Sequence, residues 1–248
     1  MHTMRRLEIS DVLDGWADFG IPVSQPAEVV RRLEGGRSNR SYLIAAGAQR
    51  FVVRLDGRQR FGVLREREYV ITRAAAATGL AAPLLYANSD LGVAISTYVD
   101  PSAQTPALQA LVERLKLVHQ LPHVQPAIDY SEHYRQYWLA AGEPGNFEEF
   151  RLQINDVTDS EPAGICHHDP GPANTTVAAG QVVFIDWEYA AWGCPIFDFA
   201  VLVADWSFSL TAVAECANID PVKLTSAVAL YRQLTKWWHA TEPGVGTS

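Results

Sequence analysis

The sequence is poor in cysteine and has no long apolar run. Its 248 residues include three cysteines. Cys166, Cys194 and Cys216 form no CxxC pair and are odd in number, which argues against a disulfide framework and favours a reducing, cytoplasmic compartment. The longest apolar stretch, 196–206, is too short to cross a bilayer and contains aspartates, and residues 1–16 lack the apolar core of a secretory signal. We therefore expect no membrane-spanning helix and no membrane partner.

Basic residues are also scarce. The chain has 20 Lys and Arg against 28 Asp and Glu, a formal net charge of -8. A nucleic-acid-binding protein usually carries a basic surface, so we expect no nucleic-acid partner. Charged residues make up 19% of the chain and hydrophobic residues 48%, which is enough apolar content for a buried core and argues against disorder. The acidic balance is compatible with a cationic small molecule.

The patterns that are present divide the chain into two parts. Before residue 100 we expect three strands within 27–57, a further strand at 91–100, and helices at 6–18 and 63–80. The polar, proline-containing stretch 100–105 resembles a connector. Beyond it the patterns are mainly helical, at 106–121, 131–142, 146–156, 197–208, 210–217 and 221–241. We predict an α+β protein of two lobes, a small β-rich N-lobe over 1–100 and a larger helical C-lobe over 101–248.

A hairpin-like segment interrupts the helical part. Asn174 begins a β-like run, 178–180 resembles a turn, and the return run ends at Asp186. Asn174 and Asp186 each lie six residues from Gly180, so we expect them to face each other, within about one residue of register and with Cβ atoms about 5 Å apart. An amide oxygen and a carboxylate at that separation can share one Mg²⁺ whose other ligands come from a substrate phosphate.

Asp169 precedes this pair by five residues. The intervening 170–173, PGPA, cannot form a helix or a regular ladder, so we expect Asp169 on a loop beside the metal pair. A carboxylate there can accept a proton from an attacking hydroxyl. Taken singly, each aspartate is more commonly a turn cap or a solvated group. A transition-metal site formed by His167 and His168 with the two aspartates is a further alternative, although adjacent histidines on a strand point apart.

The motifs in this segment together resemble the catalytic core of the aminoglycoside phosphotransferase and choline kinase superfamily, which has a protein-kinase-like fold. The family pattern is H-G-D-x-x-x-x-N, then an apolar strand ending in I-D-W-E, then G-x-x-x-x-D. The resemblance implies that Asp169 is the catalytic aspartate and that Asn174 and Asp186 bind the metal. It also implies that Asp198 is structural and that His167 holds the catalytic loop.

One position departs from the pattern. His168 stands where the family usually has glycine, which affects the backbone of the loop but removes no catalytic group. The stretch DWEYA at 186–190 is most similar to the choline/ethanolamine kinase and thiamine kinase branches.

The first 100 residues agree with this resemblance. Residues 33–44 resemble the family's short glycine-rich loop, in which Gly35, Gly36, Ser38 and Asn39 would bring backbone N–H groups to phosphates; a simple hairpin turn is the alternative. Arg54 takes the place of the phosphate-binding lysine of protein kinases and can bind phosphate through two N–H groups, although an edge-strand surface arginine is the alternative. By register, Glu68 in preference to Glu66 should pair with this arginine.

The resemblance implies an ATP-dependent, Mg²⁺-requiring kinase that phosphorylates a hydroxyl of a small-molecule acceptor, acting as a monomer or homodimer. Choline, ethanolamine or thiamine is the expected acceptor type, because aromatic walls bind such cations. Glu188, Trp192 and Trp206 are the candidate acceptor-site residues. An aminoglycoside or sugar acceptor, a catalytically silent kinase-like binding protein and a metallohydrolase remain open alternatives.

Overall fold

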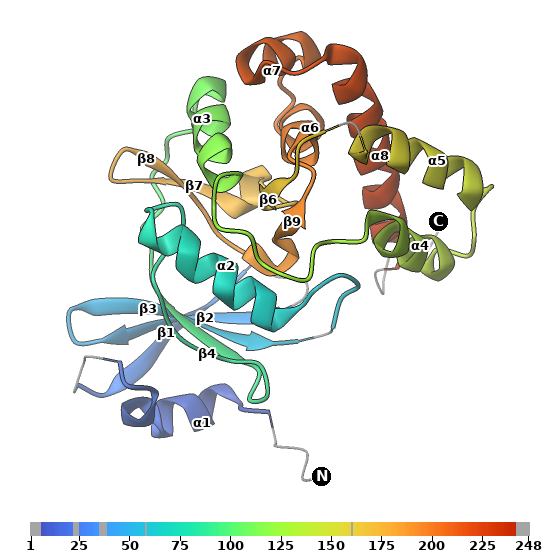
Figure 1. The fold of residues 1–248 in the computed structure, drawn as a ribbon. Helices are drawn as coiled ribbons and strands as arrows, with labels where there is room; N and C mark the ends of the chain where they lie inside the picture. Colours follow the sequence, from blue (N-terminus) through green and yellow to red (C-terminus); the bar gives the residue numbers. More distant parts are fainter. Residues whose placement is uncertain (1–5, 22–24, 35–38, 58, 160, 242–248) are drawn as a thin grey trace, which may run out of the picture.

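The computed structural model describes residues 6–21, 25–34, 39–57, 59–159 and 161–241. A five-stranded sheet forms the first part of the chain and a mainly helical part follows it (Figure 1). The predicted α+β class, with the strands in the N-terminal part, is confirmed. The division at residue 100 stays a prediction.

The sheet is antiparallel, with strand order β1-β2-β3-β5-β4. Its strands are β1 (Ala27–Leu33), β2 (Asn39–Ala46), β3 (Gln49–Asp56), β4 (Leu84–Asn88) and β5 (Val93–Thr97). The strand β4 was not predicted, because it is a short edge strand without regular burial. Hydrophobic residues on one face of β2, β3 and β5 form a core with the N-terminal helix.

Two helices flank the sheet. The predicted helix at 6–18 is divided near Gly15 into α1 (Ile9–Asp14) and the short 3-10 helix η1 (Trp16–Phe19). This pair lies below the sheet in Figure 1, and α2 (Arg65–Ala77) lies above it. Ile71 of α2 belongs to the core of the helical part, so α2 packs between the two parts and brings its first turn to their junction.

The helical part contains α3 (Leu108–Val118), α4 (Tyr130–Ala140), α5 (Phe147–Thr158), α6 (Ile196–Ala204), α7 (Leu210–Ala217) and α8 (Pro221–Ala240). Two small sheets lie within it, β6 (Gly164–Cys166) with β9 (Ala191–Gly193) and β7 (Thr175–Ala178) with β8 (Gln181–Phe184). None of the described helices is long and apolar enough to cross a membrane.

The hairpin of β7 and β8 differs in detail from the prediction. Asn174 does not begin the strand; it ends the 3-10 helix η2 (Pro172–Asn174), because the fixed φ of proline suits the first turn of a helix. The turn residues Ala179 and Gly180 both have positive φ, and the ladder continues with Ile185 N donating to Asn174 O at 2.9 Å. Asn174 therefore faces Ile185, and Asp186 lies one residue further, within the predicted margin.

Candidate active site

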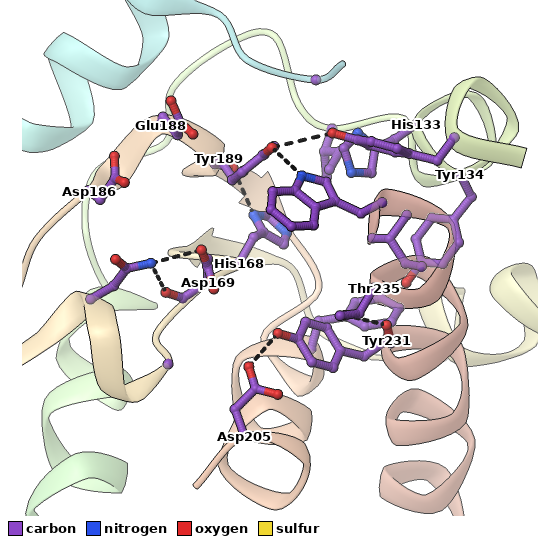
Figure 2. A pocket seen from close by; sticks show the side chains of 18 of the residues that line it. His133, Tyr134, His168, Asp169, Asp186, Glu188, Tyr189, Asp205, Tyr231 and Thr235 are labelled. Carbon is purple, nitrogen blue, oxygen red and sulfur yellow. Dashed lines mark hydrogen bonds between the residues drawn. The ribbon is translucent and has the colours of Figure 1, made fainter. Parts of the chain in front are cut away.

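Three predicted residues line one cavity. Asp169 lies on the loop between β6 and η2, and Asn174 and Asp186 lie beside the hairpin ends; all three border the same space (Figure 2). The amide nitrogen Nδ2 of Asn174 donates to Asp169 Oδ2 at 2.7 Å and to its carbonyl at 3.1 Å. This leaves Asn174 Oδ1 as the amide atom that can face a cation. Asn174 thus holds Asp169 through Nδ2 and leaves its own Oδ1 for a cation.

The buried carboxylate of Asp198 fixes the start of this loop. It accepts hydrogen bonds from the backbone N–H groups of His167 and His168 at 3.0 and 2.7 Å, and it contacts His119 Nε2 at 3.0 Å. These bonds determine the direction in which the chain enters Asp169.

His167 connects the loop to the segment that carries Asp186. Its Nε2 donates to the carbonyl of Ile185 at 3.0 Å, and its Nδ1 accepts from the backbone N–H of Asp169 at 3.3 Å. Because the ring is fully buried, desolvation lowers the pKa of His167 to about 4. A neutral ring with its proton on Nε2 satisfies both bonds.

The two adjacent histidines are bound in different directions. His167 contacts the carbonyl of Ile185, which precedes Asp186 in the sequence. His168 Nδ1 contacts the carbonyl of Tyr189, which follows Asp186, at 3.1 Å. Among the residues with described placement, no three His, Cys, Asp or Glu side chains converge as a metal site. This arrangement gives the metallohydrolase alternative no support.

Carboxylates crowd around the cavity. Burial, and then the charges of Asp186, Asp205 and Glu188, raise the pKa of Asp169 to about 8. Burial and Glu188 also raise the pKa of Asp186. A divalent cation would relieve this repulsion, and the oxygens of Asn174 and Asp186 are the donor type that Mg²⁺ prefers. The residues present therefore fit a magnesium ion that completes its coordination with phosphate oxygens.

Positively charged side chains of the sheet and α2 lie next to the carboxylates of this site: Arg65 Nη1 is 3.3 Å from Glu188 Oε2. Arg54 forms an ion pair with Glu68, whose other oxygen binds Arg65 Nη1 at 2.7 Å. Burial lowers the pKa of Arg54, but Glu68, Asp186 and Asp56 raise it above its ordinary value, so the guanidinium stays charged. Arg54 Nη2 is buried and has no hydrogen-bond partner within the described residues, while Nε lies 3.7 Å from Asp56 Oδ1. Unfilled charged donors of this kind fit a phosphate oxygen.

Arg65 is a member of this cluster that the sequence reasoning missed. Its Nε lies 3.2 Å from Asp56 Oδ1, and its Nη2 donates to Asn39 Oδ1 at 2.8 Å. Its position three residues before Glu68, on the same helix face, is the signal that could have identified it.

The predicted glycine-rich loop is only partly described. Gly35, Gly36 and Ser38 lie outside the described residues. Asn39 is buried, and its amide nitrogen donates to Glu188 Oε2 at 2.9 Å. Asn39 therefore connects β2 to the segment after Asp186, and its phosphate-binding role stays a prediction.

The cavity has a volume of about 330 Å³, and one of its walls is aromatic. Tyr189 is central to this wall: its hydroxyl lies 3.3 Å from Tyr137 Oη and 3.3 Å from Trp238 Nε1 (Figure 2). On the opposite side the Tyr231 hydroxyl donates to Asp205 Oδ2 at 2.7 Å. The cavity thus offers aromatic faces and a carboxylate to one ligand.

Most of these wall residues were not among the predicted site residues. Tyr231, Thr235 and Trp238 border the cavity from one face of α8, and their i, i+4, i+7 spacing is a signal that the sequence contains. His133 of α4 borders it too, and burial lowers the pKa of this histidine to about 3, so the ring is neutral.

Two predicted acceptor-site residues lie elsewhere. Trp206 does not line the cavity; its Nε1 donates to the carbonyl of Pro170 at 2.9 Å, in the loop that follows Asp169. Trp192 lies in β9, with its ring centroid 4.3 Å from that of His123. Neither side chain lines this cavity, because aromatic content does not show which way a side chain faces, and their acceptor-site role stays a prediction. Glu188 does border the cavity, while its carboxylate binds Asn39 and Arg65.

Comparison with known sequences gives two matches. The model of the phosphotransferase enzyme family matches residues 29–218. The protein LicA of Haemophilus influenzae is 24% identical over 200 residues, which are 72% of this chain and 58% of that protein. The alignment thus spans little more than half the length of this curated relative.

The fold is similar to those of solved kinases. Choline kinase LicA from Streptococcus pneumoniae superposes with a TM-score of 0.74 at 17% identity, covering 97% of this chain and 93% of that one. Spectinomycin phosphotransferase, solved with ADP and spectinomycin, gives a TM-score of 0.62 at 13% identity, covering 93% and 85%. The predicted kinase-like fold is confirmed.

Proposed function

The chain belongs to the phosphotransferase enzyme family, and from this premise we propose that it transfers the γ-phosphoryl group of ATP to a hydroxyl of a small cationic molecule. One observation carries the proposal: a single cavity is bordered by Asp169, Asn174 and Asp186 at one end and by the aromatic wall at the other. A ligand in that cavity can place a hydroxyl beside Asp169 while its cationic group contacts the aromatic faces.

Asp169 is the proposed base. Its carboxylate borders the cavity, is held by Asn174, and can take the hydroxyl proton as the acceptor oxygen forms a bond to the γ-phosphorus. The bond from that phosphorus to the bridging oxygen breaks, and ADP leaves with the electron pair. Arg54, held by Glu68, is the proposed phosphate-binding cation, and its Nη2 is a charged donor without a hydrogen-bond partner in the described residues. Magnesium, when bound by Asn174 Oδ1 and Asp186, would neutralise phosphate charge.

The cavity chemistry favours a choline-, ethanolamine- or thiamine-like acceptor. Tyr137, Tyr189 and Trp238 supply π faces, to which organic cations bind. Asp205 adds negative charge, and the neutral His133 adds no opposing positive charge. The likeness to a protein described as a choline kinase supports this acceptor class.

The test is ADP release with Mg-ATP against choline, ethanolamine, thiamine, several aminoglycosides and amino sugars. We expect turnover with one of the first three, and we expect Asp169→Asn to lower kcat by about 10²–10⁴-fold, the usual contribution of a general base. Asp220→Asn is the matched control, because Asp220 caps α8 and asparagine caps equally well. Turnover only with an aminoglycoside or sugar would replace the proposed acceptor. ATP binding without turnover on any acceptor would favour a binding protein.

A further inference from the structure

The backbone at His168 has an unusual conformation. Its φ is +66°, in the left-handed region that side-chain-bearing residues other than Asn, Asp and His rarely adopt. The same peptide donates its N–H to the buried Asp198 at 2.7 Å. The turn therefore sets the direction of the next residue, Asp169.

The imidazole of His168 is bound at both nitrogens. Nδ1 lies 3.1 Å from the carbonyl oxygen of Tyr189, which can only accept, so Nδ1 carries the proton. Nε2 is then an acceptor, and the Tyr130 hydroxyl, 2.7 Å away, donates to it. The oxygen of that hydroxyl accepts from the backbone N–H of Cys194 at 2.7 Å. A directed chain of hydrogen bonds thus runs from Cys194 through Tyr130 and His168 to Tyr189.

The space around this chain is shaped to accommodate it. A Cβ atom on Gly193 would lie 2.4 Å from the Tyr130 hydroxyl oxygen and 3.1 Å from His168 Nε2. Only a residue without a side chain leaves room for the pair at this position. The close approach at Gly193 is an observation separate from the hydrogen-bond distances, and it indicates that Tyr130 and His168 have a fixed arrangement.

The chain joins the catalytic loop to the aromatic wall. His168 directly precedes Asp169, while the ring of Tyr189 is central to the wall through its contacts with Tyr137 and Trp238. Figure 2 shows the imidazole between Asp169 and Tyr189, with its bond to the Tyr189 backbone. His168 therefore links the backbone of Tyr189 to the residue before the proposed base.

We propose that His168 is a positioning residue that sets the placement of Asp169 relative to the acceptor wall, through its bonds to the Tyr189 carbonyl and the Tyr130 hydroxyl. This inference rests on the proposed phosphotransfer, in which Asp169 must meet a hydroxyl presented by that wall.

Three variants test it with the acceptor that the wild-type protein uses. His168→Gly keeps the left-handed turn but loses both side-chain bonds, and we expect kcat to fall about 10–100-fold through misplacement of the base. His168→Asn also tolerates the turn and can donate to the Tyr189 carbonyl, so it should recover part of kcat. Tyr130→Phe removes only the donor to Nε2 and should cause a smaller fall. The KM for ATP should change by less than about twofold in all three, because the phosphate-binding residues are untouched.

Each outcome is decisive. A wild-type kcat in His168→Gly overturns the proposal, as does a loss explained wholly by a smaller folded fraction, measured by circular dichroism on the same samples. The second readout is the imidazole tautomer of the free protein, from long-range ¹H–¹⁵N NMR. A proton on Nδ1 is expected, and one on Nε2 overturns the hydrogen-bond chain. Absence of wild-type turnover on every acceptor would remove the proposed function, while the tautomer would still decide the chain.

Discussion

At the scale of single residues, the buried Asp198 fixes the start of the loop that leads to Asp169. It is fully buried and accepts two backbone N–H groups as well as a contact from His119. Burial alone raises the pKa of Asp198, but the hydrogen bond and charge of His119, with the other two histidines, hold it below its ordinary value. The carboxylate therefore stabilises the fold at pH values above about 3.9, its unfolded pKa, and this stability is lost as the pH falls through the lower folded value.

We expect Asp198→Asn to lower the free energy of unfolding by about 2–4 kcal/mol at pH 7, because an amide NH₂ would meet backbone donors in a buried site. Urea unfolding followed by tryptophan fluorescence measures the change. The difference from wild type should shrink as the pH falls through the lowered folded pKa of Asp198, because the wild-type carboxylate then also becomes protonated. Asp220→Asn, the same chemical change at a helix cap, should be nearly neutral. Equal losses in the two variants would contradict this account.

At the scale of elements, the turn between β7 and β8 is an imperfect hairpin turn. Ala179 and Gly180 have φ of +49° and +76°, both left-handed, the geometry for which Asn-Gly is the preferred sequence. We expect Ala179→Asn to raise the free energy of unfolding by about 0.5–1 kcal/mol, because asparagine tolerates this conformation better than alanine.

Gly180→Ala should lower the free energy of unfolding by about 1 kcal/mol through backbone strain alone, since nothing lies within 4 Å of a Cβ added at Gly180. Thermal unfolding of both variants is the measurement, and shifts of the same sign would show that the turn does not limit stability.

At the scale of the whole molecule, Arg67 of α2 connects separate parts of the chain. Its guanidinium is buried and donates to three main-chain carbonyls, those of Ala190 at 3.0 Å, Pro126 at 3.2 Å and Gly62 at 2.8 Å. A guanidinium suits this arrangement because its planar group carries five N–H donors in fixed directions. Arg67 therefore fixes α2, and with it the sheet, against the helical part.

We expect Arg67→Met to lower the free energy of unfolding by about 2–4 kcal/mol, because it leaves buried carbonyls without donors. Amide hydrogen exchange should accelerate more in β2 and β3 than in α6, since the sheet loses a connection that α6 does not use. Arg135→Met is the control, because Arg135 forms an exposed pair with Glu132, and its loss should cost less than about 0.5 kcal/mol. Uniform acceleration across all elements would show that Arg67 contributes to global stability and does not couple the two parts.

The sequence predicted much of this molecule because many of its signals are local. Alternation identified β2 and β3, helical periodicity identified α3 to α8, and the spacing around Asp169 indicated the family, which the match over 29–218 confirms. Signals that depend on distant partners were not readable. β6 pairs with β9 across 24 intervening residues, so neither short run could be recognised as a strand. The orientations of Trp192 and Trp206 depend on the packing of their elements. The cavity-facing side of α8 could be recognised only from the structure, in which it borders the same cavity as η3 (Trp187–Tyr189).

Several bonds that hold the site together end on main-chain carbonyls. The donors are His167, His168, Trp187, Trp206 and Arg67, and the acceptors include the carbonyls of Ile185, Tyr189, Phe184, Pro170 and Ala190. A carbonyl is present whatever side chain its residue carries, so such a frame constrains the donors and leaves the accepting positions free to change. Tyr189 shows the result: its carbonyl belongs to the frame, while its ring belongs to the cavity wall. Residues that line this cavity can therefore change during evolution, and acceptor specificity with them. The main-chain hydrogen bonds that position the loop before Asp169 do not depend on those side chains.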